Sequence, residues 1–346
     1  MLLKWGIFLL ILKVFVNQNF ISNNIRNYTP VTFRHFKNLT IITKRNTFIV
    51  NINQKTLILS TKWHTICIGN IYINVFTEGR IDMEFKKIIY TVQEGIATVT
   101  MNYPKNLNAI DEQMADELIY VVDVAEKDPK VKVVVIKGPE KAFSAGGDIG
   151  YFYKLIQSGG EVNMDGLISK VGIVANGLKK MSKIVITSVS GAAAGAGFSL
   201  ALAGDFMICA DNAKFILAFV NIGLVPDTGI TYQLSKAIGT SRTMELAATG
   251  RLLGAEEARS LGLAYKVTTV NELEDETMKF AKKIASGPLL SYKNIKKQIY
   301  DSNYSDYQKW LKDTEIPTQR ECAASMDFQE GCKAFMEKRK PVFEGK

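Results

Sequence analysis

From residue 83 onward the sequence predicts an α/β core with a helical region appended at its carboxyl end. Two observations lead to this fold class. Short apolar runs alternate with helical patterns along the first part of this stretch, and from Leu252 the pattern is helical almost throughout. Alternation followed by a helical tail is typical of an α/β core with added helices. No repeat of fixed period is visible.

The first elements are a hairpin and a helix. Residues Lys87–Gln93 and Ile96–Met101 alternate or run apolar around Glu94-Gly95, which is a hairpin signal. Asp111 then precedes an amphipathic pattern over Glu112–Lys127, and an aspartate in that position is a common amino-terminal cap.

The next elements are strands that we expect to be buried on both faces. Lys132–Lys137 and Ile184–Val189 are short β-branched runs, with a helix at about residues 165–182 between them. Asp205–Ala210 is a further strand. We expect the carboxyl-terminal helices at Ala255–Ser260, Asn271–Ser286, Leu289–Asp301, Asp306–Asp313 and Phe328–Glu337.

Composition changes sharply near residue 82. Residues 1–82 contain no alanine, eleven asparagines and fourteen isoleucines, and their ten basic and two acidic residues give a net charge of +8. The rest of the chain is nearly neutral and contains no histidine, since His35 and His64 are the two in the chain. Residues 83–346 therefore exclude Ser-His-Asp and Cys-His mechanisms and histidine-ligated metals. Four cysteines without a C-x-x-C pair indicate reduced thiols and, with them, a cytoplasmic protein.

Three interpretations of residues 1–82 stay open. The segment could be a targeting peptide, although its apolar run Trp5–Leu12 is too short to span a bilayer and lacks a small-residue cleavage site. It could be a basic arm for nucleic acid or anionic lipid, but its charges are scattered singly. It could also be an untranslated leader, with Met83 as the true start directly before the first strand.

Two glycine-rich turns follow predicted strands and carry the candidate chemistry. They are FSAGGD at 143–148 and GAAAGAG at 191–197. Small residues let a ligand approach the backbone closely, and unpaired N–H groups at a helix start can stabilise an anion. Two such turns facing one point would form an oxyanion hole; tight helix–sheet packing is the structural alternative. Neither turn matches a phosphate loop or a clean dinucleotide motif.

Together with NIGLVPDTGITYQL at 221–234 and AFMEKRKPVFEGK at 334–346, these turns resemble the enoyl-CoA hydratase/isomerase (crotonase) family. The resemblance covers residues 83–346. It implies a spiral of ββα units over residues 83–270, a helical trimerisation region over residues 271–346, and a homotrimer or a dimer of trimers. It also implies an acyl-CoA substrate with no separate cofactor and no metal. We expect no nucleic-acid partner and no transmembrane span.

The resemblance also implies site residues. The N–H groups of Gly147 and Ala196 would bind the thioester oxygen, and the backbone around Ala142–Ala145 would hold the adenine end of CoA. Phe335, Lys338 and Arg339 resemble the part that approaches the CoA 3′-phosphate, often from a neighbouring subunit. The expected CoA-binding residues are Ala142, Ser144, Ala145, Gly147, Asp148, Ile149, Gly195, Ala196, Phe335 and Lys338.

The sequence departs from the family's hydratases at both of their catalytic glutamates. Ser199 and Phe219 stand at those positions, and we expect them in the acyl pocket instead. Because a general acid or base contributes about 10²–10⁴-fold, losing both predicts little hydratase activity.

One carboxylate remains in a suitable place, Asp227 in VPDTG. This motif looks most like 1,2-epoxyphenylacetyl-CoA isomerases and related enoyl-CoA isomerases, and a single carboxylate can move a proton between two carbons. The structural alternative for Asp227 is a helix cap. We interpret Asp148 as mainly a cap and Asp205 as structural. Ser199 could offer its hydroxyl to the acyl tail, and the alternative, which we favour for this residue, is an ordinary position in a helix.

The sequence thus predicts a crotonase-family isomerase in fatty-acid or aromatic-acid degradation, with Asp227 as the proton carrier. The alternatives are a hydratase with other catalytic residues, an enzyme that uses Asp227 for another thioester reaction, and a non-catalytic acyl-CoA- or RNA-binding protein.

Overall fold

The computed structural model describes the backbone of the strand segments 31–32, 39–44, 47–52, 55–68 and 71–78, and residues 85–139, 141–159 and 163–345 in full. The chain divides into two compact units, Met1–Glu84 and Phe85–Lys346. In the first unit each strand pairs antiparallel with the next, in the order β1 (Val31–Thr32), β2 (Leu39–Lys44), β3 (Thr47–Ile52), β4 (Lys55–Ile68), β5 (Ile71–Glu78). The three interpretations of residues 1–82 stay predictions.

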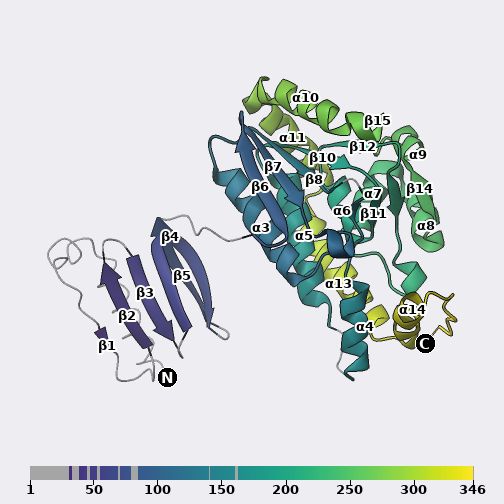
Figure 1. Ribbon diagram of the computed structural model, residues 1–346, viewed down its shortest axis with the longest axis horizontal. Coiled ribbons are helices and arrows are strands. Elements are labelled where there is room, and N and C mark those ends of the chain that lie inside the picture. The colour runs from purple at the N-terminus through teal and green to yellow at the C-terminus, as the bar shows by residue number, and fades with distance from the viewer. Residues whose placement is uncertain are drawn as a thin grey trace. The chain divides into compact units, whose positions relative to one another are not determined.

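The second unit is built on a largely parallel sheet (Figure 1). Its strand order is β15-β12-β10-β8-β7-β6, and the hairpin pair β6/β7 is antiparallel. Glu94 and Gly95 take the left-handed conformation in that hairpin, as its two-residue turn requires. The strands are β6 (Ile88–Gln93), β7 (Ile96–Met101), β8 (Val133–Lys137), β10 (Ile184–Val189), β12 (Phe206–Ala210) and β15 (Lys266–Thr268).

A second, smaller sheet is formed by four short strands, three of which directly follow strands of the main sheet. Its order is β14-β13-β11-β9, with β14 antiparallel to β13. Each of β8, β10 and β12 is followed by one of these short strands and then by helix, which is the expected ββα order. The short strands are β9 (Ala142–Ser144), β11 (Ala192–Ala194), β13 (Lys214–Ile216) and β14 (Leu252–Gly254).

Helices cover both faces of the main sheet. Side chains alternate along a strand, so Val133 and Val135 of β8 pack in one cluster with α10, while Val134 and Ile136 face the cluster that holds α3 and α5. This confirms the prediction of strands buried on both faces. The longer helices are α3 (Glu112–Lys127), α4 (Ile149–Gln157), α5 (Asp165–Lys180), α6 (Ala196–Leu202), α7 (Ile230–Ile238), α8 (Thr240–Thr249), α9 (Ala255–Ser260), α10 (Leu273–Ala285) and α11 (Leu289–Asn303).

The carboxyl-terminal helices pack back against earlier helices of this unit. Figure 1 shows α13 near α4 and α14, and Phe152 of α4 contacts Phe328 of α14 with ring centroids 6.2 Å apart. The predicted helix over Asp306–Asp313 is a short helix followed by a π-helical turn, and the helix after it was not predicted. These segments are α12 (Tyr307–Trp310), η4 (Leu311–Glu315), α13 (Ile316–Ala323) and α14 (Met326–Met336).

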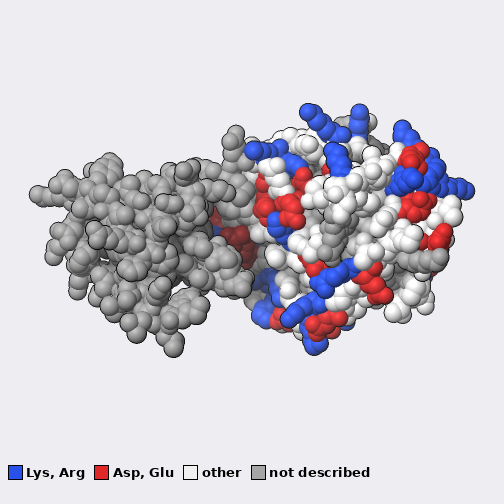
Figure 2. Space-filling model, turned by 90° about the horizontal axis from the view of Figure 1, so that it is seen from below, with Lys and Arg blue, Asp and Glu red and all other residues white. Residues whose placement is uncertain are grey.

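The lengths of the helices and the distribution of surface charge can be compared with what a membrane or nucleic-acid partner would require. Among the residues that the structure describes, no helix is long and apolar enough to cross a membrane. On the face drawn in Figure 2, the basic and acidic side chains of the second unit are intermixed over its surface.

Candidate functional site

A small cavity lies where the two glycine-rich turns meet. Its volume is about 70 Å³, and its walls come from both turns, the start of α5, the 3₁₀ turn η2 (Val220–Ile222) and Asp227-Thr228. Most of the lining is apolar, with a single carboxylate. The lining side chains outside the turns include Ile110, Ile149, Phe152, Met164, Leu167, Ile168, Val171, Phe219, Ile222 and Leu224.

The two turns touch each other at their glycines. Gly146 has a φ of +87°, and a Cβ there would lie 2.6 Å from the Ala194 carbonyl oxygen and 3.5 Å from the Ala196 nitrogen. A side chain would therefore push the turns apart, which explains why glycine occupies this position. Gly147 and Ala196, on either side of this contact, both line the cavity.

Ser144 holds the first turn from behind. Its hydroxyl donates to the Asn108 carbonyl oxygen at 2.8 Å and accepts from the Gly146 N–H at 3.1 Å. A Cβ on Gly197 would lie 2.6 Å from the Ser144 Cβ, so the start of α6 packs directly on this residue. The small residues of both turns thus allow the two turns to pack tightly against each other beside one cavity.

Asp227 is the carboxylate of the cavity. Its side chain is 8% exposed, and its Oδ2 accepts a hydrogen bond of 2.8 Å from the Gln319 side-chain amide. Burial raises the pKa of this carboxyl to about 7, although hydrogen bonds from Gln319 and Thr228 act in the opposite direction. A carboxyl with a pKa near neutrality can both accept and return a proton.

A second buried carboxyl stands behind Asp227. Glu315 is 2% exposed, and its two oxygens accept from the Gly229 N–H at 3.0 and 2.8 Å. Burial and the negative charge of Asp227 raise the pKa of Glu315 to about 9, against the backbone hydrogen bonds that lower it. Glu315 therefore holds its proton more readily than an ordinary glutamate does, because a second negative charge beside Asp227 is unfavourable.

The helix-cap alternative for Asp227 is wrong. Helix α7 begins after Gly229, and its cap residue makes no side-chain capping bond. The Asp227 carboxylate is turned to the cavity and to Gln319 instead.

Seven of the predicted site residues line this cavity: Ala145, Gly147, Ile149, Gly195, Ala196, Phe219 and Asp227. Six do not line it: Ala142, Ser144, Asp148, Ser199, Phe335 and Lys338. Ala142 and Ser144 are buried in β9, whereas Phe335 in the last turn of α14 and Lys338 just after that helix are exposed. Contacts of these residues with CoA stay predictions.

Three polar residues have structural contacts. Ser199, expected in the acyl pocket, is fully buried outside it, and its hydroxyl donates to the Thr228 carbonyl oxygen at 2.6 Å. Asp148 caps α4 by accepting from the Tyr151 N–H at 3.0 Å. Asp205 accepts from Val185 and pairs with the buried Lys296 ammonium at 2.7 Å. The structural interpretations of Asp148 and Asp205 are confirmed.

Gln319 and Glu315 are residues that sequence reasoning missed. Both lie in a stretch without apolar periodicity, with Pro317 between them. The available signal was their spacing, because residues four apart share one helix face and Pro is well tolerated in a first helical turn.

A larger cavity of about 270 Å³ lies along later turns of α5, beside α7 and α11. In it, Lys179 donates to the carbonyl oxygens of Leu202 and Gly204 at 2.6 and 3.1 Å. Neither glycine-rich turn nor Asp227 reaches this cavity, so we place the candidate site in the smaller one. Within the described part of the chain, no group of three His, Cys, Asp or Glu side chains is arranged to hold a metal ion.

Comparisons with known proteins agree with this architecture. A family model described as enoyl-CoA hydratase/isomerase matches residues 91–346. The chain is 37% identical over 264 residues to the trans-2-decenoyl-[acyl-carrier-protein] isomerase of Streptococcus mutans and 34% identical over 272 residues to the 1,2-epoxyphenylacetyl-CoA isomerase of Escherichia coli. Each match covers 76% of this chain and 100% of the relative.

A solved structure shows the same fold. An enoyl-CoA hydratase from Mycobacterium avium subsp. paratuberculosis superposes with a TM-score of 0.68 at 31% identity, covering 75% of this chain and 98% of that chain. The resemblance stated from the motifs is thus confirmed, and so are the ββα units with helices at the carboxyl end. The chain belongs to the enoyl-CoA hydratase/isomerase, or crotonase, family, whose enzymes act on acyl-CoA thioesters.

Proposed function

We propose that this protein is an isomerase that moves a double bond within an enoyl thioester. The main-chain N–H groups of Gly147 and Ala196 bind the thioester oxygen, and Asp227 carries the proton. The observation that supports this most strongly is that Asp227 lines the same small cavity as both turns.

The reaction needs one base and one anion site. The Asp227 carboxylate removes a proton from a carbon beside the double bond, and the electron pair moves through the conjugated system to the thioester oxygen. The two N–H groups stabilise that negative charge, and one such donor is worth about 2.7–4 kcal/mol. The protonated Asp227 then returns the proton to another carbon, and the charge leaves the oxygen. No atom is gained or lost, so no cofactor or metal is required.

The neighbouring positions favour isomerisation over hydration. A hydratase must activate a water molecule, and the family's two glutamates are replaced by the apolar Phe219, which lines the cavity, and by Ser199, which is buried outside it. Asp227 would be left as both base and acid, and one carboxylate suffices for a shuttle.

The names of the relatives suggest a class of substrate. One is an isomerase of decenoyl chains on acyl carrier protein, and another isomerises an aromatic epoxide on CoA. We propose an acyl-CoA substrate for this chain, within fatty-acid or aromatic-acid degradation, and a cytoplasmic homotrimer or dimer of trimers. Ala142–Ala145 and the end of α14 would hold the CoA moiety.

Hydration is the second candidate, since a solved relative of similar fold is named an enoyl-CoA hydratase. One experiment separates the two. The enzyme is incubated with 2-enoyl- and 3-enoyl-CoA esters of several lengths in deuterated water, and the products are analysed by mass spectrometry. We expect a shifted double bond with exchange of a carbon-bound hydrogen. Rapid addition of water to crotonyl-CoA would overturn the isomerase assignment, and the absence of any turnover would favour the non-catalytic alternative.

A further inference from the structure

The loop that carries Asp227 is strained. Thr228 has a φ of +59° and Gly229 a φ of +79°, so two consecutive residues are left-handed. A β-branched residue rarely takes this conformation, because its side chain is crowded by the backbone there. Such a loop keeps its shape only when the surrounding contacts hold it.

Gln319 provides one of these contacts with both ends of its side-chain amide. Its Oε1 accepts from the Val225 N–H at 3.2 Å, and its Nε2 donates to Asp227 Oδ2 at 2.8 Å. The first bond fixes which end of the amide points where, because a main-chain N–H can only donate. The side chain is fully buried, so water does not compete for Asp227 from this side.

Glu315 holds the far end of the same loop. It lies one helical turn before Gln319, on the same face, and both its oxygens accept from the Gly229 N–H. Gln319 and Glu315 thus bracket the segment Val225–Gly229, and the buried Ser199 hydroxyl bonds the Thr228 carbonyl oxygen from α6.

The segment that bears these two residues is itself anchored to the cavity wall. The π-helical turn η4 ends at Glu315, and such turns are frequent at functional sites. Leu311 of this turn packs on Gly172 of α5, where a Cβ would lie 2.9 Å from a Leu311 methyl carbon. Arg320 binds Asp165 at the start of α5, with 3.0 Å between Arg320 Nε and Asp165 Oδ2.

We propose that Gln319 is a positioning residue for Asp227, which it orients through a hydrogen bond to one carboxylate oxygen, while Glu315 fixes the loop that bears it. The inference rests on the proposed function of Asp227 as proton carrier. It assigns to the carboxyl-terminal helices a part in setting the geometry of the reaction, because Gln319 holds Oδ2 of Asp227.

The charged surroundings of Asp227 make this testable by pH. The charge of Asp227 acts on Glu315 in the π-helical turn, and Glu315 in turn acts on Tyr307 of α12. The Gln319 and Thr228 hydrogen bonds lower the pKa of Asp227, so removing the Gln319 donor must raise that pKa further.

The test compares three substitutions of Gln319 in the full chain. Gln319→Leu and Gln319→Met lose both hydrogen bonds. For both we expect kcat to fall by about 10- to 100-fold with KM within about threefold, because misplacing a reacting group by about 1 Å can cost that much. The acid limb of the kcat–pH profile should move to higher pH. Gln308→Leu, the same change at an exposed position of α12, is the matched control and should leave both unchanged.

Gln319→Glu is the conservative variant and keeps the proposal testable if the apolar variants do not fold. Its side chain still accepts from Val225, but it donates to Asp227 only while protonated. At low pH we expect Gln319→Glu to be more active than Gln319→Leu. At higher pH we expect it to lose activity, because a second carboxylate would then face Asp227.

Three results separate a failure of the positioning role from a failure of the proposed function. If Asp227→Asn is inactive while the Gln319 variants keep the wild-type kcat and pH profile, the positioning role is overturned and the proposed function stands. If Asp227→Asn is fully active, the proposed function itself fails. A Gln319→Glu enzyme with an unaltered pH profile overturns the positioning role whatever the fate of the other variants.

Discussion

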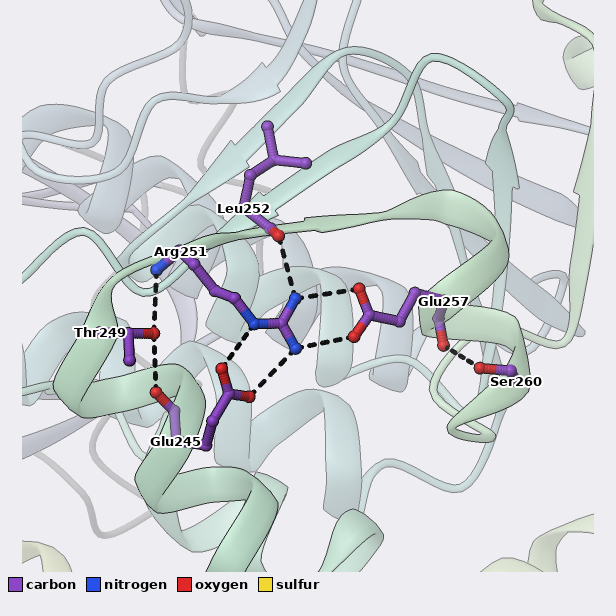
Figure 3. A network of polar contacts seen from close by, with 6 residues as sticks. All are labelled: Glu245, Thr249, Arg251, Leu252, Glu257 and Ser260. Atoms are coloured by element: carbon purple, nitrogen blue, oxygen red, sulfur yellow. Dashed lines mark hydrogen bonds and ion pairs between the residues drawn. The ribbon is translucent and has the colours of Figure 1, made fainter.

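Two polar networks in the second unit shift the pKa of their carboxylates in opposite directions. On the surface, Arg251 binds Glu245 and Glu257 at once, with N–O distances of 2.6–3.0 Å, and joins α8 to β14 and α9 (Figure 3). These hydrogen bonds lower the pKa of both glutamates. In the site, Asp227 is buried with a neutral amide and a second acid for neighbours, and its pKa is raised to about 7.

The difference separates a structural from a reactive carboxylate. A glutamate held by a guanidinium stays ionised at every physiological pH and cannot exchange protons usefully. Among the described residues, no cation is bonded to Asp227, so the pKa of its carboxyl stays close to neutral pH. Burying this carboxyl lowers the stability of the folded protein. The predictions below test this contrast, beginning with the largest effect.

Asp227→Asn should reduce isomerase turnover by 10²-fold or more, because the amide cannot accept the proton. Binding of CoA esters should change little, since the two main-chain donors remain. Steady-state kinetics and a titration with a non-reactive acyl-CoA measure the two effects. Wild-type turnover in the variant would remove Asp227 from the mechanism.

Gly146→Ala should reduce kcat/KM by about 10-fold or more, because the new Cβ would meet the Ala194 carbonyl oxygen at 2.6 Å and separate the two turns. Gly254→Ala is the control from the surface region, near Arg251, where a Cβ would meet no atom within 4 Å. Kinetics and thermal melts of both variants check this. Equal behaviour of the two would mean that the contact between the turns is not required.

The main strands and helices and the local motifs of the site could be predicted from the sequence. The strands Ile96–Met101 and Ile184–Val189 and the helices Glu112–Lys127 and Ala255–Ser260 lie where apolar periodicity indicates them. The turns and Asp227 were found through the family's motifs, since small residues and a VPDTG segment are local features. Their meeting in one cavity required the fold.

The support of the site could not be predicted in the same way. The short strands β9 and β11 have too few residues for a pattern to appear, and Glu315 and Gln319 act across about 90 residues of chain. Ser199 was expected in the acyl pocket because it stands at the position of one of the family's catalytic glutamates. Its bond to Thr228 depends on a loop that sequence alone does not fold.

Asp227 should also make stability depend on pH. Its pKa in the folded state, about 7, exceeds the ordinary 3.8, so the unfolded chain loses this proton first and stability falls as pH rises between these values. At about 1.4 kcal/mol per pH unit the loss is on the order of 4 kcal/mol as an upper bound. Asp227→Asn lacks it. In thermal melts, the melting temperature of Asp227→Asn relative to the wild type should be higher at pH 8 than at pH 5. An equal difference at both pH values would contradict the raised pKa.

The surface network around Arg251 should have the smallest effect on stability, and its dependence on pH should be opposite to that of Asp227. Arg251→Gln should leave kinetics unchanged and lower the melting temperature by a few degrees at most, because exposed ion pairs contribute little. The pKa values of Glu245 and Glu257 lie below their ordinary value, so their contribution is present above it and is lost as pH falls through the lowered values. The difference from wild type should therefore shrink in acid, and also in about 1 M salt, which screens exposed charges beyond about 3 Å. A destabilisation that grows in acid or persists in salt would show that Arg251 acts through packing, since a charge effect requires ionised partners.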